Sequence, residues 1–402
     1  MRTQRRALFS WLPGWSVSLS ARLAWTWLLF VLVLAIIGPL IANEKPYYCR
    51  LDGESYFPIF SGIDEAALSR KHTTHSPVDW KQTAFESVWR APIPYSYYTI
   101  DLKTGSHISP FAEQEHALRF RHWLGTDVAG RDVLAGMIRG CRVSLLIGLG
   151  SMLLALLIGI PVGSAAAYWG NNSFRISWMQ MFMLVISILI FFYVFSLHVS
   201  VATKFLVWTI LLPITLLFWF LLNRLHIGKT SFPLDRITMS VISVLDSFPG
   251  LFLILIVLVI IPQKGWLVVL GVIALMRWPV MARYMRAEVF KLKETHYIKS
   301  AQVINLPDLH ILTKDIIPYA FRPVMISFIF GVSSAILAES SLSFLGVGLP
   351  VEELNWGRLL SQSRNHFDAW WLVLFPGFAI FFTLLSLYTI GNATGKSMVQ
   401  RA

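Results

Sequence analysis

The 402-residue sequence is 55% hydrophobic and only 14% charged, whereas a soluble domain carries about 25% charged residues. This composition excludes an ordinary soluble protein and predicts an all-α polytopic membrane protein. The net charge of +12 does not indicate nucleic-acid binding, because the cytoplasmic loops of membrane proteins carry excess lysine and arginine. The sequence contains no P-loop and no cluster of metal ligands, so we expect no cofactor and no ATP hydrolysis by this chain itself.

The first predicted element is an apolar run at residues 23–42, which is long enough to cross the hydrocarbon core of a membrane. Residues 1–22 contain several arginines and no acid, which predicts a cytoplasmic N-terminus. A cleaved signal peptide is the alternative interpretation, but the run is too long and no small-residue cleavage site follows it. Residues 1–42 are therefore interpreted as a cytoplasmic segment and a first span.

Residues 43–127 form a polar insert in which acidic residues outnumber basic ones, unlike a cytoplasmic loop. Its prolines and aromatic residues predict an irregular, partly folded extracytoplasmic lobe of unassigned fold. The insert contains Cys49, and the only other cysteine of the chain is Cys141. Nothing in the spacing of these two residues favours a disulfide between them.

A helix is predicted after the insert, with Thr126 or Asp127 as its N-cap. It contains Arg131 and places basic residues around apolar ones, a pattern typical of a helix at the membrane interface. The apolar run at residues 143–168 follows as the second span, and its glycines and alanines predict a face for close helix packing. We assign residues 128–171 to the interface helix and this span.

Residues 172–232 contain two further apolar runs, at 176–197 and 205–222, and neither run has a charged residue. Each run is long enough to cross a membrane. The segment is therefore predicted to be an extra transmembrane hairpin. Because a hairpin adds two spans, it leaves the sidedness of everything downstream unchanged.

The remaining predicted spans lie within residues 233–392, and residues 393–402 form a C-terminal tail. The approximate limits of these spans are 241–261, 266–282, 319–337 and 370–390. Together with the earlier runs they predict eight spans, with both ends of the chain in the cytoplasm and the polar insert outside.

A polar loop at residues 284–317 separates two of these spans, and its basic residues predict a cytoplasmic location. A short helix is expected at residues 295–304, because Tyr297, Ile298, Ala301 and Ile304 fall on one face at helical spacing. The loop therefore offers a short amphipathic helix to the cytoplasm.

The end of this short helix is also encoded in the sequence. Asn305 tolerates the left-handed conformation that ends helices, and Pro307 prevents easy continuation. A second segment at residues 310–317 leads to Pro318 and the next apolar run. The pattern predicts a helix, a sharp turn and a second helix.

Two long motifs carry a family resemblance. Residues 122–133 read HWLGTDVAGRDV, and residues 337–348 read LAESSLSFLGVG. Both resemble motifs of ABC-transporter permease subunits of the peptide/nickel importer class, in particular the C-type subunit of oligopeptide and dipeptide permeases. The matching residues singled out as family motif are Gly125, Thr126, Asp127, Gly130, Arg131, Asp132, Glu339, Trp356 and Gly357.

The 284–317 loop resembles the EAA loop of the same family, in which a short helix docks into the ATPase subunit. Here Lys-Ser-Ala replaces Glu-Ala-Ala, an asparagine replaces the turn glycine, and the segment ends at a matching proline. The residues to which this resemblance assigns ATPase coupling are Tyr297, Ile298, Lys299, Ser300, Ala301, Asn305 and Pro318.

The resemblance implies a type I ABC importer-like transmembrane domain with an extra transmembrane hairpin and an extracytoplasmic insert. It implies a multi-pass permease subunit of the bacterial cytoplasmic (inner) membrane, surrounded by membrane lipid. The expected partners are a sister permease subunit, two ATPase subunits and an extracytoplasmic substrate-binding protein. The expected cargo is a peptide or related small molecule, and nickel chelates or other non-peptide cargo are the alternative.

Two other function classes compete with this interpretation. A secondary transporter or channel usually places ionisable residues at mid-membrane, and only Asp246, Arg277 and Arg322 lie inside or close to apolar runs. No inverted repeat is visible either. A membrane-bound serine hydrolase is suggested by the serines beside Glu339, but no histidine with an orienting acid lies near them in sequence. A polar residue at the outer end of a helix is the simpler interpretation of Glu339.

Overall fold

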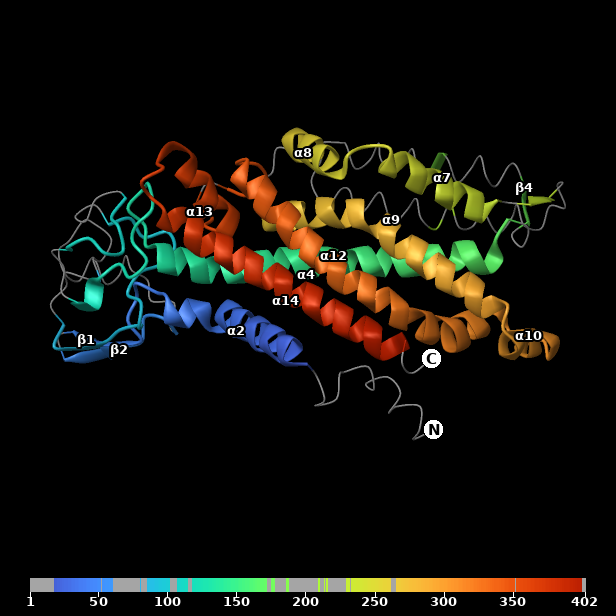
Figure 1. Cartoon of the computed structure of the whole chain (residues 1–402), viewed down its shortest axis with the longest axis horizontal. Coiled ribbons are helices and arrows are strands. Elements are labelled where there is room, and N and C mark those ends of the chain that lie inside the picture. Colours follow the sequence, from blue (N-terminus) through green and yellow to red (C-terminus); the bar gives the residue numbers. More distant parts are fainter. Residues whose placement is uncertain are drawn as a thin grey trace. The chain divides into compact units, whose positions relative to one another are not determined.

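The computed structural model is mostly helical, and its helices are labelled in Figure 1. The described residues are 18–51, 53–60, 80, 85–101, 107–114, 118–171, 175–177, 186–187, 209, 213, 215, 229–231, 233–261, 265–350 and 352–399. The predicted extra hairpin at 172–232 falls almost entirely outside these residues, so it stays a prediction. The chain forms two compact units, each described separately below.

The first unit comprises Met1–Ile160, Asp246–Tyr284 and Phe321–Ala402, and the second comprises Pro161–Leu245 and Met285–Ala320. Three helices continue from one unit into the other: α4 (Val133–Trp169), α9 (Trp266–Lys293) and α12 (Ile317–Phe344). The first unit also contains α2 (Leu19–Ile41), α8 (Gly250–Ile260), α13 (Trp356–Gln362) and α14 (Trp371–Val399).

Five helices of the described part are long and apolar enough to cross a membrane. They are Leu19–Ile41, Val133–Trp169, Trp266–Lys293, Asp308–Phe344 and Trp371–Lys396. Each contains one of the apolar runs predicted from the sequence. The helices α2 and α14 lie side by side (Figure 1), and the Trp27 indole of α2 donates a hydrogen bond to Thr383 of α14 at 3.1 Å.

The run predicted as a span at 241–261 is divided between two helices that meet at an angle of 84°. The helix α7 (Leu234–Asp246) ends before Pro249, and α8 begins after it. Proline lacks a backbone N–H and disfavours helical geometry in the residue that precedes it. The apolar character of the run is correct, and the bent pair of helices counts as a candidate sixth span.

The interface helix and the second span, expected as successive elements, form the single helix α4 of 37 residues. Its N-cap is Asp132, whose Oδ1 accepts a hydrogen bond from the Ala135 N–H at 2.7 Å. Thr126 and Asp127 were expected in that role. They are excluded from it because Gly130 adopts a φ of 79° and keeps the preceding turn out of the helix.

The described part of the polar insert contains a small antiparallel sheet with the order β2-β1-β3. Its strands are β1 (Tyr48–Leu51), β2 (Glu54–Tyr56) and β3 (Ser87–Trp89). Cys49 is buried beneath the sheet with Trp80, and burial raises the pKa of its thiol. Cys49 and Cys141 are both free, and they lie in different clusters.

The second unit is built around the C-terminal end of α4, the C-terminal end of α9, and α7. It also contains α10 (His296–Val303), α11 (Asp308–His310) and the π-helix η2 (Ile311–Ile316). The strands β4 (Arg175–Ser177) and β5 (Lys229–Ser231) pair antiparallel, so they bring together the two ends of the segment predicted as a hairpin.

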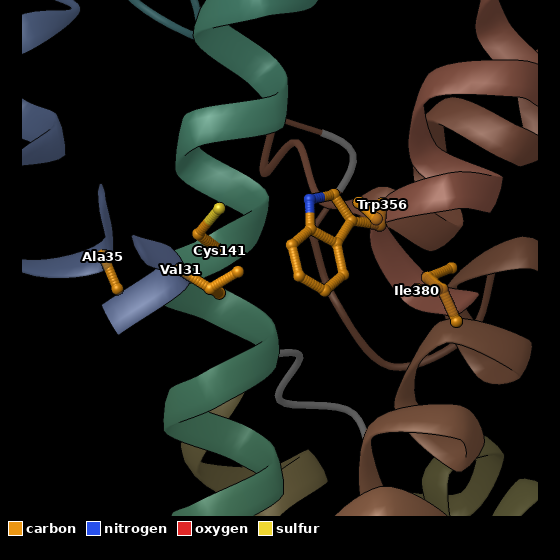
Figure 2. Close-up of a cluster of buried hydrophobic side chains, with 6 residues drawn as sticks. Val31, Ala35, Cys141, Trp356 and Ile380 are labelled. Carbon is orange, nitrogen blue, oxygen red and sulfur yellow. The ribbon is translucent and has the colours of Figure 1, made fainter. Parts of the chain in front are cut away.

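One buried cluster joins four helices of the first unit. Figure 2 shows the Trp356 indole of α13 beside Cys141 of α4, with Val31 and Ala35 of α2 and Ile380 of α14 nearby. The indole N–H donates to the Met137 carbonyl at 3.1 Å. A side chain at Gly140 would overlap the ring, so glycine is required there for α4 to approach α13.

Replacing Trp356 with alanine is expected to destabilise the folded chain by about 3–5 kcal/mol, because the change removes a fully buried aromatic side chain. The thermal unfolding midpoint of the detergent-solubilised protein measures this effect. Phe367→Ala is the matched control, since Phe367 is 89% exposed and should leave the midpoint unchanged. Equal unfolding midpoints for the two variants would contradict the assignment of Trp356 to the buried core.

Candidate functional site

The predicted coupling segment of the second unit is a short helix that ends in a tight turn. The helix α10 begins after Thr295 and ends at Val303, within one residue of the predicted limits. Asn305 adopts the left-handed conformation expected from the sequence, with a φ of 60°. Its N–H donates to the Gln302 carbonyl at 3.0 Å, and the Leu306 N–H donates to the Ala301 carbonyl at 3.3 Å. These two bonds form a Schellman motif, which fixes the direction of the chain after the helix.

The second half of the segment is helical but longer than predicted. The chain is helical from Asp308 through η2 into α12. Pro318 therefore lies in the first turn of α12 and does not end the helical segment. The π-helix buries Ile311, Leu312 and Ile316.

The two halves of the segment are joined across the turn. The Tyr297 hydroxyl of α10 donates a hydrogen bond to Asp315 Oδ1 of η2 at 2.7 Å. This bond raises the pKa of Tyr297 above its usual value, because the ionised phenol would face the carboxylate. Ile298 and Ala301 of α10 are 1% and 7% exposed, so they are buried within this chain itself.

The buried and exposed faces of α10 differ from the single docking face expected from the sequence. Tyr297 is 60% exposed, whereas Ile298 and Ala301 are covered by the chain. On the opposite side and at the turn, Val303 and Ile304 are 85% and 70% exposed. Both side chains therefore lie on the surface of this chain.

The other two residues of the Lys-Ser-Ala stretch are exposed. Lys299 forms an ion pair with Glu294 at 2.8 Å, and both side chains are more than half exposed. Such a pair contributes little to stability. Ser300 donates a hydrogen bond to the His296 carbonyl of its own helix. Neither contact buries Lys299 or Ser300, so both side chains remain accessible to a partner.

Polar contacts within the second unit hold the segment at its base. Lys293 of α9 donates to the Tyr168 carbonyl of α4 at 2.6 Å, and the Tyr168 hydroxyl donates to Asp308 at 2.8 Å. Arg286 of α9 donates two hydrogen bonds to Asp235 of α7. Bidentate arginine–carboxylate pairs restrain geometry as well as add energy. Sequence reasoning did not identify this support, since the partners are separated by many residues.

Asn305→Val is expected to impair transport, because a β-branched residue at positive φ costs about 1–2 kcal/mol and reorients the turn. Asn305→Gly, which restores the residue of the family pattern, should transport at least as well as the parent chain. Uptake rates at matched expression measure both effects. Equal uptake by the valine and glycine variants would contradict the role given to the turn.

The motif at residues 125–132 lies in the first unit and forms a buried, hydrogen-bonded loop. Asp127 accepts bonds at Oδ1 from the Ala129 and Arg131 N–H groups, both at 2.8 Å. Its Oδ2 accepts from Arg131 Nε at 2.9 Å and from Gln362 of α13 at 3.2 Å. The aspartate therefore shapes its own loop and links it to α13.

The neighbouring residues of this motif make the loop's remaining links. Thr126 accepts a hydrogen bond at its carbonyl from the Trp371 indole of α14 at 3.0 Å. Asp132 Oδ2 lies 2.8 Å from His122 Nδ1, and both side chains are buried. Gly125 has a φ of 80°, and a Cβ there would overlap the Ile108 carbonyl. The motif therefore connects the polar insert to the helices through hydrogen bonds and close packing.

Glu339 of α12 is fully buried and receives hydrogen bonds from four side chains. Ser144 of α4 donates at 2.9 Å and Ser343 at 3.1 Å, while Ser340 donates at 3.4 Å. Asn355, the N-cap of α13, donates from Nδ2 to the same carboxylate. The serines and the amide act as donors to the carboxylate, so the serine-hydrolase interpretation gains no support from this arrangement.

The Glu339 network brings together motif residues from separate parts of the sequence. Gly357 lies beside this network, where α13 meets α12. A side chain at this position would overlap the Ser340 carbonyl. Ser144 and Asn355 were not selected as site residues from the sequence. Asn355 was detectable, since an asparagine directly before a helical Trp-Gly pair is a strong N-cap signal.

Comparison with known proteins shows which proteins this sequence is similar to. Residues 225–401 match the family described as binding-protein-dependent transport system inner membrane component. The chain is 28% identical to the inner membrane ABC transporter permease protein YejE of Escherichia coli K12, over 91% of this chain and 89% of that protein. It is 25% identical to the peptidoglycan transport system permease protein YejE of Agrobacterium fabrum, over 94% and 89%. It is 26% identical to the dipeptide transport system permease protein DppC of Alkalihalophilus pseudofirmus, over 67% and 69%.

Proposed function

We propose that the chain is a multi-pass permease subunit of an ABC importer of the inner membrane, and that it forms, with a sister permease subunit, the translocation pathway for peptides or related small cargo. The cargo proposal is supported by relatives whose names specify dipeptide and peptidoglycan transport. Nickel chelates or other non-peptide cargo are the alternative, because a delivering binding protein would carry much of the cargo selectivity.

Two separate ATPase subunits supply the energy in this proposal, and α10 is the element that contacts one of them. The single observation that supports this role most is the exposure of Val303 and Ile304 on a helix whose other face is packed on its own chain. A helix held in this way can transmit a force, since it cannot yield independently of its support. The exposed Tyr297 borders the same contact and remains tied to η2 through Asp315.

The transmission step follows from how the segment continues. The chain passes from α10 through the Asn305 turn into η2 and directly into α12. Closure of the ATPase subunits on ATP would displace α10, and the displacement would reach α12 without an intervening flexible loop. Cavity access would then switch between the two sides by a rigid-body movement, biased by contacts that differ between nucleotide states. The permease itself performs no covalent chemistry.

Co-purification tests this assembly directly. An affinity-tagged chain, solubilised in mild detergent from its native membrane, is expected to bring down a second permease and a P-loop ATPase. The ATPase activity of that complex should rise when a loaded extracytoplasmic binding protein is added. A chain that purifies alone and still moves solute in vesicles would instead indicate a secondary transporter or channel.

A further inference from the structure

A partly open cavity of about 240 Å³ lies in the first unit, between α4, α9 and α12. Its polar lining consists of Arg277 and Tyr284 from α9 with Ser327 and Ser334 from α12. No acidic residue lines it among the residues that the structure describes. The cavity therefore offers one fixed positive charge together with three hydroxyl groups.

The depth of Arg277 makes this charge unusual. It lies 11 residues after Trp266, the first residue of α9, which at a rise of about 1.5 Å per residue is roughly 16 Å along the helix axis. This position lies inside the predicted span at 266–282. Charged residues at that depth face a bundle interior or a water-filled cavity and mark substrate pathways.

The other ionisable residues noted within or near the apolar runs have partners. Asp246 pairs with Arg283, Glu339 is held by four donors, and Arg322 also has a polar interaction. Arg277, in contrast, makes no hydrogen bond or ion pair with the part of the chain that the structure describes. Its five N–H donors are therefore available to a ligand that lies outside the described residues. A carboxylate is the group that a guanidinium binds in a bidentate manner.

We propose that the Arg277 cavity binds the carboxylate of the transported cargo as it passes through the membrane. This inference rests on the proposed importer function and adds the chemical class of group that the pathway recognises. The volume is below the roughly 300–1,000 Å³ of pockets that hold whole small molecules, so the cavity fits an end group. A lipid phosphate is a poorer match, because headgroups lie at the membrane interface, whereas Arg277 lies inside the predicted span.

The first test measures the charge preference of the cavity without any cargo. The assembled transporter carries Ser334→Cys in a background of Cys49→Ser and Cys141→Ala, and it is reacted with methanethiosulfonate reagents of similar size. The sulfonate reagent should react about tenfold faster than the trimethylammonium reagent. Arg277→Gln should abolish this ratio, and Arg277→Lys should retain most of it. Leu345→Cys, exposed beyond the end of α12, is the control site and should show no such ratio.

The second test asks whether cargo is the source of the carboxylate. Uptake of a tripeptide and of its C-terminal amide is compared, each delivered at saturation by the binding protein. Arg277→Gln should reduce uptake of the free-carboxylate peptide at least tenfold and alter uptake of the amide much less. If the parent transporter takes up neither peptide, the proposed cargo fails, and the reagent ratio still decides whether the cavity selects anions.

Three results would overturn the inference. One is equal reaction of the two reagents in the parent background, which is expected if an acid of a sister subunit already occupies Arg277. Another is a ratio that vanishes when the vesicles contain anionic lipid, which would assign the cavity to a lipid phosphate. The third is an equal loss of uptake for both peptides in Arg277→Gln, which would make the arginine a structural residue.

Discussion

Val303→Asp is expected to abolish ATPase association and uptake while the permease still inserts and folds. Val303 is 85% exposed in this chain, so the new charge is solvated until an ATPase covers it. A desolvated charge without a partner costs several kcal/mol, and about 1.4 kcal/mol already weakens an association tenfold. We therefore expect more than a hundredfold loss of ATPase affinity, measured by titrating the ATPase onto the solubilised permease.

Two companion variants separate this contact from the fold of the segment. Ala301→Asp should also abolish uptake, but because Ala301 is buried within the chain it should additionally loosen α10 and expose it to protease. Val303→Thr keeps the shape of the side chain and should cost no more than a few-fold in affinity. Normal uptake by Val303→Asp and Ala301→Asp at normal expression would show that this loop is not the coupling element.

Glu339→Ala is expected to cause the largest loss of stability among single changes in the first unit. It removes the acceptor shared by Ser144, Ser343 and Asn355 and leaves buried donors unsatisfied. Each unsatisfied buried group costs about 1–3 kcal/mol, so a total of roughly 3–9 kcal/mol is expected for the three donors. The unfolding midpoint of the solubilised complex measures it, with Glu339→Gln as the milder isosteric control.

A double-mutant cycle with Asn355→Ala tests whether the network acts as a unit. Because the two side chains share a hydrogen bond, their effects should be less than additive, with a coupling of about 0.5–3 kcal/mol. Ser333→Ala is the comparison, since the one hydrogen bond of Ser333 within the described residues goes to the Ile329 carbonyl of its own helix. Additive effects of Glu339→Ala and Asn355→Ala would mean that the carboxylate does not link α12 to α13.

The sequence predicted local features well where a single residue type determines them. Asn305 was expected to be left-handed because few residues accept that conformation, and its φ of 60° agrees. The apolar runs were expected to be long helices because a membrane requires such runs. The same reasoning did not predict the bend within 241–261, which lies where Pro249 separates α7 from α8.

Contacts between distant segments could not be predicted from one sequence. The periodicity of α10 identified Ile298 and Ala301 as one face, but it could not tell whether that face meets a partner or the chain's own η2 region. Glu339 was recognised within a motif, yet its partners Ser144 and Asn355 lie on separate helices. Likewise, Arg277 was noted as an intramembrane charge, and only the structure revealed the cavity beside it.

The most direct test of the importer assignment is uptake by proteoliposomes that contain the chain, its sister permease and both ATPase subunits. With loaded binding protein outside, and ATP enclosed with the ATPase subunits, labelled tripeptide should accumulate against its gradient. Accumulation should stop with a non-hydrolysable ATP analogue and with Val303→Asp. Accumulation driven by an ion gradient in the absence of ATP would contradict the account.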